Sequence, residues 1–300
     1  MYNNLTNITT ESWSWPWWGV MVTVNIISTI VFIYLMIRMF KTVKKESKNS
    51  KYLKTLAIFG TIYVGVALYR SVFVSSYTGQ KAWFDSMANS MVIIRSLAFF
   101  AEISFACLIG LGLRHMNQEL ELPESIQKRT WLKKYLLASP YIIIACLCTA
   151  QIFAWTGLLT QYVFLFAIEE TLWALGFTSV LPLIIIQLNN LCTNYKNDSS
   201  LRMYKSFLLV LSIFTVGYLL FQYAYQLPFG YYLEIANDMA NGTHYPLNVD
   251  SFIRAFEELH PTRSFEEWGG LGFFIWHSGY FSICVWMNIF FACGPRLLKK

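Results

Sequence analysis

The amino-acid sequence predicts an all-α integral membrane protein, a bundle of seven transmembrane helices that forms a single domain over residues 1–300. Hydrophobic residues make up 56% of the chain. Charged residues make up only 13%, about half of the fraction that is usual in soluble domains. Seven separate windows are apolar over the roughly 20 residues that a helix needs to cross the hydrocarbon core of a bilayer. Together these observations predict a polytopic membrane protein.

The seven windows follow one another with short connections. They cover residues 17–39, 52–74, 90–113, 132–153, 159–188, 206–227 and 269–291. Between the fourth and fifth windows only the segment AWTGLLTQ can form the turn. Pro140 and Pro182 lie inside windows, where we expect them to bend the helix without ending it.

The distribution of Lys and Arg predicts the orientation. The first connection, RMFKTVKKESKNSKYLK, is strongly basic, and the third, the fifth and the tail at 294–300 are also net basic or end in basic clusters. The outer N-terminal segment, 1–16, has no Lys or Arg. Basic connections stay in the cytoplasm. The sequence therefore predicts a plasma-membrane protein with its N-terminus outside and its C-terminus in the cytoplasm.

The connection at 228–268 is the longest, and we expect it to be a structured outer loop. VDSFIRAFEELHP is typical of a short amphipathic helix that Asp250 caps, and Ser264 and Glu267 have the spacing of a capping box before the last span. This loop could be a lid over the bundle or a surface decoration. The N-terminus has no basic segment of the kind that precedes a cleaved signal peptide.

Charged and polar residues inside the windows lie in one layer, in the outer half of the bundle. The candidate binding residues are Glu102, Glu169, Glu170, Arg70, Arg95, His277 and Asn25. A charge at this depth is costly unless it faces the interior and finds a partner. We therefore expect a polar pocket that is open to the outside, in which Arg70 and Arg95 neutralise the carboxylates. The alternative is a buried ion-pair network that only fixes helix packing.

Helix geometry limits how these residues meet. Arg95 and Glu102 are seven residues apart and share a face, but they are separated by about 10 Å along it, which predicts that they do not pair directly. Glu169 and Glu170 are about 100° apart around their helix. At most one of them faces the bundle axis, and the other should meet an Arg from a neighbouring helix.

His277 is the only histidine within the seven windows that lies in the charged layer. A zinc site would need further ligands, and the sequence predicts no metal and no cofactor. Proton relay, ligand contact and a hydrogen-bonded packing role all remain open for this histidine.

Seven helices with an outer N-terminus are also found in G-protein-coupled receptors and microbial rhodopsins, but the residues do not fit either family. The last window, FFIWHSGYFSICVWMNIFF, has no lysine for a retinal Schiff base. The third window ends GLGLRHM and lacks the receptor Asp-Arg-Tyr. The segments IIRSLAFFAEISFA, AIEETLWAL and YFSICVW resemble an uncharacterised family of multi-pass bacterial membrane proteins. That resemblance implies the fold and no particular function.

The sequence leaves three functions open. In the first, the pocket binds a small polar solute or ion for transport or ion conduction. In the second, the same pocket belongs to a receptor-like sensor, which the uncharged inner halves of the helices favour. In the third, the protein is a membrane-embedded enzyme that uses Glu and His as acid and base. The expected partners are the lipid bilayer and the solute, with a homo-oligomer possible and no nucleic acid.

Overall fold

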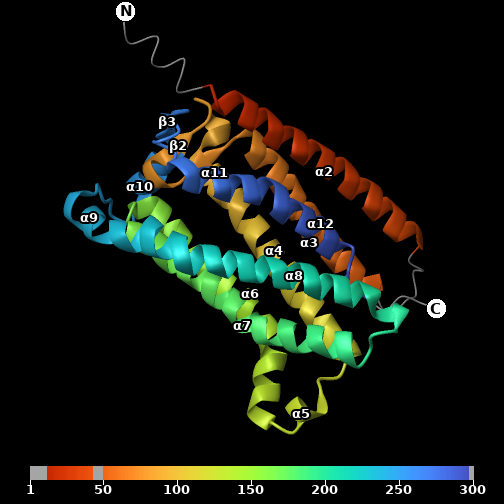
Figure 1. Cartoon of the computed structure of the whole chain (residues 1–300). Coiled ribbons are helices and arrows are strands. Elements are labelled where there is room, and N and C mark those ends of the chain that lie inside the picture. Colours follow the sequence, from red (N-terminus) through yellow and green to blue (C-terminus); the bar gives the residue numbers. More distant parts are fainter. Residues whose placement is uncertain (1–11, 43–49, 297–300) are drawn as a thin grey trace, which may run out of the picture.

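The computed structural model describes residues 12–42 and 50–296, and these residues are predominantly helical (Figure 1). Six helices within them are long and apolar enough to cross a membrane. They are α2 (Ser14–Thr42), α3 (Ser50–Val72), α4 (Met91–Glu119), α6 (Thr130–Thr160), α7 (Val163–Thr193), and α8 (Arg202–Phe221) with its continuation through η4 (Gln222–Tyr232) and α9 (Leu233–Asn241). The predicted all-α membrane architecture is confirmed at this level.

The seventh predicted window is helical but divided. It consists of α11 (Gly270–Gly279), the π-helical η5 (Tyr280–Cys284) and α12 (Val285–Ala292), which follow one another without a break. The segment η4 is also π-helical. A π-helical segment is wider than an α-helix, and such segments are frequent at functional sites.

Several helices run further than the sequence predicted. Helix α6 continues to Thr160, so Gln161 and Tyr162 alone connect it to α7. The predicted turn over 154–161 is therefore largely wrong. Gln161 makes this tight turn possible because it adopts a left-handed conformation with φ of 60°, and its N–H bonds to the Gly157 carbonyl at 2.7 Å. Both Pro140 and Pro182 lie inside unbroken helices, as expected.

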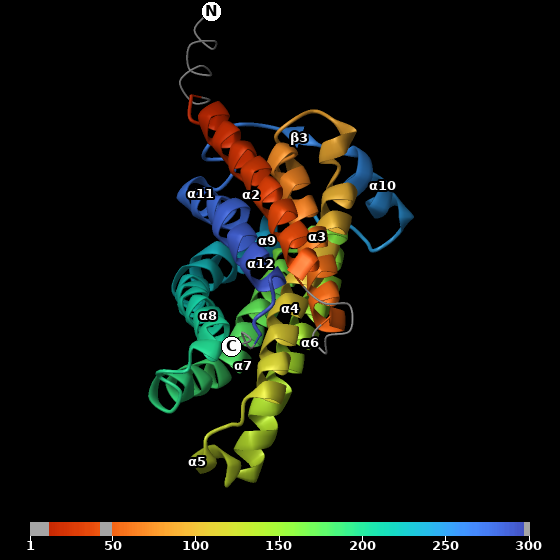
Figure 2. The ribbon, with the colours of Figure 1, turned by 90° about the vertical axis from the view of Figure 1, so that its right-hand side faces the viewer.

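Helix α4 lies at the centre of the bundle, packed against α3, α6 and α12 (Figure 2). Helices α6 and α7 form a long antiparallel pair, and α2 lies at the edge against α3. Helices α4 and α6 approach closely at Gly110, where a Cβ atom would lie only 2.6 Å from the Pro140 carbonyl oxygen. Small residues commonly permit such contacts between membrane helices.

The connections at the end of the bundle opposite the basic end join to form a cap. Strand β1 (Ser75–Ser76) pairs antiparallel with β2 (Lys81–Ala82), which pairs in parallel with β3 (His260–Pro261). The short helices η1 (Thr78–Gln80), η2 (Met87–Asn89) and α10 (Val249–Glu257) lie at the same end of the bundle. Two further short helices, α5 (Glu124–Gln127) and η3 (Ser199–Leu201), lie in the connections at the basic end. The sequence did not predict the small sheet, because its two-residue strands carry no periodic pattern.

The predicted amphipathic helix in the long outer loop is confirmed as α10, but its cap is not. The Asn248 side chain accepts a hydrogen bond from the Ser251 N–H at 3.0 Å, so Asn248 is the cap and Asp250 lies in the first turn. Parts of the predicted 1–16 segment and 294–300 tail, namely 1–11 and 297–300, lie outside the described residues.

Only half of the predicted capping box forms. The Glu267 N–H donates to the Ser264 hydroxyl at 3.4 Å, but the following residues form turns before α11 begins. The Glu267 carboxylate instead meets His260 Nε2 at 3.0 Å. Hydrogen bonds from Thr262 and His260 hold the pKa of Glu267 below its usual range. His260 belongs to β3, so this contact ties the turn to the small sheet of the cap.

Candidate functional site

A buried ion cluster forms where α4, α6 and α7 meet. Arg95 Nη2 lies 3.2 Å from Glu102 Oε2, and Arg95 Nη1 lies 3.3 Å from Glu169 Oε1. The Arg95 side chain is 1% exposed. This confirms the prediction that an Arg from the second or third helix, Arg70 or Arg95, pairs with one of the two adjacent glutamates.

The prediction that Arg95 and Glu102 stay apart is wrong. The estimate used the rise of the helix between the two backbone positions, but the arginine side chain is long enough to extend along the face. The glutamate side chain leans back toward the N-terminus of α4, as side chains on a helix do. The Arg95 guanidinium therefore forms ion pairs with two carboxylates, those of Glu102 and Glu169.

Gln151 completes the ion cluster and was not among the predicted residues. Its Nε2 donates to Glu102 Oε2 at 2.8 Å and to the Leu147 carbonyl at 3.2 Å, while its Oε1 accepts from Arg95 Nη2. Gln151 is 1% exposed. It is the only amide side chain in the fourth window, and this was the signal that could have identified it.

Glu170 lies on a different side of α7 from Glu169, as the 100° offset requires. Its predicted Arg partner is replaced by an amide: Gln222 Nε2, in η4, donates to Glu170 Oε2 at 2.8 Å. Tyr218 of α8 packs against Phe177 of α7 with 4.9 Å between ring centres, and Tyr231 belongs to η4, as Gln222 does. We call Glu170, Gln222, Tyr218 and Tyr231 the Glu170 subsite.

Arg70 does not pair with a carboxylate in the described part of the chain. Its Nη1 donates to the Tyr280 hydroxyl at 3.0 Å, and its guanidinium carbon lies 4.8 Å from the centre of that ring. Electrostatic interaction still links it to Glu102 and Glu169. Arg70 therefore contributes positive charge near the ion cluster without a direct ion pair.

No ion pair or hydrogen bond among the described residues joins Asn25 or His277 to the carboxylates, so their place in one binding layer stays a prediction. Asn25 Nδ2 donates to the carbonyls of Met21 at 2.8 Å and Phe281 at 2.9 Å. Phe281 belongs to the π-helical η5, so Asn25 satisfies an irregular backbone and joins α2 to it. His277 packs against the ring of Phe273, with 4.2 Å between ring centres. The described residues contain no group of three potential metal ligands.

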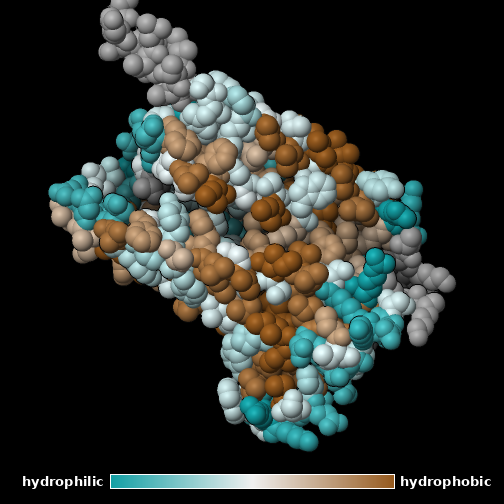
Figure 3. All heavy atoms as spheres, viewed as in Figure 1, coloured by the Kyte–Doolittle hydropathy of each residue, from teal (hydrophilic) through white to brown (hydrophobic). Residues whose placement is uncertain are grey.

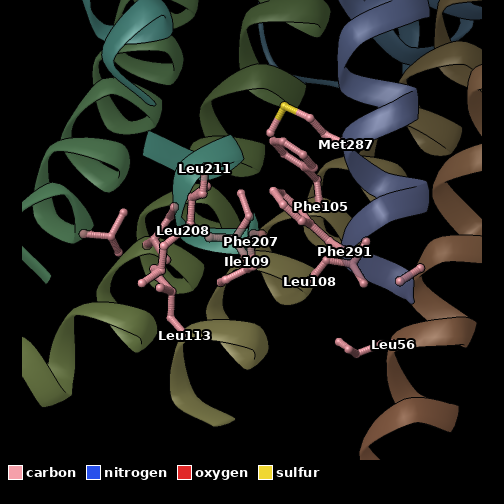
Figure 4. Close-up of a cluster of buried hydrophobic side chains, with 14 of the residues drawn as sticks. Leu56, Phe105, Leu108, Ile109, Leu113, Phe207, Leu208, Leu211, Met287 and Phe291 are labelled. Carbon is pink, nitrogen blue, oxygen red and sulfur yellow. The ribbon is translucent and has the colours of Figure 1, made fainter. Parts of the chain in front are cut away.

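Apolar side chains pack most of the half of the bundle interior that lies toward the basic connections (Figure 4). The labelled residues Leu56, Phe105, Leu108, Ile109, Leu113, Phe207, Leu208, Leu211, Met287 and Phe291 are all buried. They come from α3, α4, α8 and α12. The ion cluster therefore lies in one half of the interior, and the other half is mainly apolar, with buried amides at Gln187, Asn190 and Asn288.

The surface has a different pattern, which fits a helical bundle that crosses a membrane. Hydrophobic residues cover the middle of the face in Figure 3, and hydrophilic residues gather toward its two ends. The fold and the buried charges define a helical membrane protein with an ionic centre inside its bundle. Comparison with protein-family models, curated proteins and solved structures finds no match to this chain.

Proposed function

We propose that the chain crosses the plasma membrane seven times, with the N-terminus outside and the C-terminus in the cytoplasm. The unbroken run from α11 through α12 is long enough to serve as the seventh span. The basic first, third and fifth connections support this orientation. The cap then lies on the outer surface, and the basic end of the bundle lies in the cytoplasm.

Cysteine labelling tests this topology. In a variant without the six native cysteines, a cysteine at Asn241 should react with a membrane-impermeant maleimide in intact cells, because it lies on the outer cap. A cysteine at Lys48 should react only after permeabilisation. Labelling of the Lys48 position in intact cells would contradict the orientation.

We propose that the bundle binds a small monovalent cation from the outside and acts as a receptor-like sensor. The observation that supports this is the division of the interior. Its charged half holds three carboxylates, Glu102, Glu169 and Glu170, against two guanidinium groups, Arg70 and Arg95. One negative charge is left over. The half toward the basic connections is packed mainly with apolar side chains, which leaves few polar groups there to carry an ion.

The Glu170 subsite is the favoured binding position. Both carboxylates of the ion cluster already share Arg95, whereas Glu170 has an amide partner. Gln222 Oε1 is buried without a hydrogen-bond partner among the described residues. Tyr218 and Tyr231 belong to the neighbouring segments α8 and η4, and aromatic rings attract cations, ammonium groups in particular. A carboxylate beside aromatic rings is the chemistry that an organic ammonium solute requires.

Tetramethylammonium is a suitable probe. We expect it to raise the melting temperature of the purified protein in detergent, and we expect Glu170→Gln to abolish that rise. At a concentration of 100 times Kd, a ligand specific to the folded state stabilises it by about 2.7 kcal/mol. Differential scanning fluorimetry measures the shift.

Glu234→Gln is the matched control because Glu234 is an exposed carboxylate on α9. It should keep the full response to tetramethylammonium. Sodium chloride at equal ionic strength separates specific binding from a general salt effect. An equal response in the Glu170→Gln variant would refute the proposed subsite.

A second candidate is transport by alternating access. The two π-helical segments, η4 and η5, favour it because such segments are frequent at functional sites and permit helix rearrangement. Tetramethylammonium-dependent counterflow in proteoliposomes would favour transport over sensing. The enzyme alternative has less support, since no described contact joins His277 to a carboxylate.

A further inference from the structure

A separate cavity with basic residues in its wall lies at the basic end of the bundle. It has a volume of about 350 Å³ and lies between the first turns of α3 and the last turns of α4. Lys51 and Tyr52 line it from α3, and Arg114, His115 and Glu119 line it from α4. None of these residues belongs to the ion cluster or to the Glu170 subsite, so the cavity is separate from the proposed cation site, and only its placement at the cytoplasmic leaflet rests on the proposed topology.

The charges of the cavity favour a monoanion. Lys51 and Arg114 each carry one positive charge, and Glu119 carries one negative charge, so the balance is one positive charge when His115 is neutral. Neither Lys51 nor Arg114 forms an ion pair with another residue in 12–42 or 50–296. A phosphodiester carries one negative charge, and Arg and Lys are its usual protein partners.

The cavity wall is ordered by aromatic contacts. The ring of Tyr52 stacks on His115 with 4.0 Å between centres and an interplanar angle of 24°. The Arg114 guanidinium carbon lies 5.6 Å from the centre of the Tyr141 ring on α6. His115 is 8% exposed. These contacts place aromatic rings beside two of the basic groups of the cavity, His115 and Arg114.

Exposed apolar residues continue from the cavity along the sides of the bundle. Ile58, one turn deeper on α3 than the cavity-lining Thr55, is 60% exposed, and Tyr141 is 52% exposed. A ligand with a phosphate head and acyl chains can therefore place its head in the cavity and its chains against these residues. Free phosphate makes no use of this apolar surface.

We propose that this cavity binds the phosphate group of an anionic phospholipid in the adjacent leaflet. Basic pockets between membrane helices on the cytoplasmic side are a recognised form of lipid site. The expected ligand is a lipid with one phosphodiester group, and its acyl chains lie against the exposed apolar residues beside the cavity. Lys51 and Arg114 supply the charge, and Tyr52 and His115 supply the ordered wall.

Native mass spectrometry of the full chain tests the proposal with phosphatidylglycerol as the probe. Each basic residue near a membrane surface contributes about fivefold to anionic lipid affinity, so Lys51→Gln with Arg114→Gln should weaken phosphatidylglycerol binding on the order of 25-fold. The matched control is Lys54→Gln with Lys133→Gln, since both lysines are exposed and neither lines the cavity. That control should bind phosphatidylglycerol as the parent protein does.

Three outcomes decide the question. Equal phosphatidylglycerol binding by the cavity variant and the control would overturn the proposal, as would equal retention of phosphatidylcholine and phosphatidylglycerol by the parent protein. Displacement of phosphatidylglycerol by inorganic phosphate would assign the cavity to free phosphate and overturn the lipid assignment. If the double variant fails to fold, Arg114→Gln alone should lose about fivefold while Arg114→Lys retains most of the binding.

Discussion

Replacement of Arg95 by glutamine is expected to lower the free energy of unfolding by about 3–5 kcal/mol, the scale for removing one partner of a buried ion pair. Glu102 and Glu169 both depend on this guanidinium, and their side chains are 11% and 10% exposed. Without it, two carboxylates remain close together in an interior that water scarcely reaches. Titration with SDS in mixed micelles, followed by circular dichroism, measures the loss.

The combination Arg95→Gln, Glu102→Gln and Glu169→Gln should recover most of that stability, because it removes both unpaired charges. The double variant Arg95→Gln with Glu102→Gln should recover only part, since Glu169 then remains alone. Residues in one ion-pair network couple by about 0.5–3 kcal/mol. Arg202→Gln, at an exposed arginine at the start of α8, is the control and should have little effect. Additive losses across the series would contradict the shared role of Arg95.

The sequence was sufficient to predict which charged residues are buried together, but not which of them pair with one another. Depth along each helix placed Arg95, Glu102 and Glu169 in the same layer, and the structure pairs them. Rotation about each helix axis and side-chain reach decide the partners, and the hydropathy pattern contains neither. Asn25 was therefore assigned to the pocket although it bonds to the backbone of η5. The π-helical shape of η5 was not visible in the sequence.

The same reasoning explains the outer cap. The pattern of α10 was visible because nine residues are enough to show amphipathic spacing. Its attachment was not visible because it depends on Gln80, which is more than 170 residues away in the chain. Gln80 takes up a left-handed backbone conformation with φ of 48° and donates its Nε2 to the Glu258 carbonyl at 3.2 Å. Long-range contacts of single polar side chains leave no periodic signal.

Arg254 joins this cap to the bundle. Its Nη2 donates to the carbonyls of Leu159 at 2.9 Å and Leu158 at 3.3 Å, which are near the C-terminal end of α6, and its Nη1 donates to Gln80 Oε1. The guanidinium carbon also lies 3.9 Å from the centre of the Tyr245 ring. One side chain therefore satisfies helix-end carbonyls and connects three segments of the chain.

Arg254→Gln is expected to release the cap locally without unfolding the bundle. Hydrogen bonds from a charged donor contribute about 1.5–3 kcal/mol each, so the loss of even one corresponds to an increase in the local opening equilibrium of roughly 10- to 150-fold. Hydrogen–deuterium exchange across α10 and η1 measures that increase, while exchange in α4 should stay unchanged. Arg254→Lys keeps the charge but lacks the planar fork, so it should restore only part of the protection. Unchanged exchange in α10 would show that the small sheet and apolar packing hold the cap, and the cap would then be a fixed cover of the outer surface.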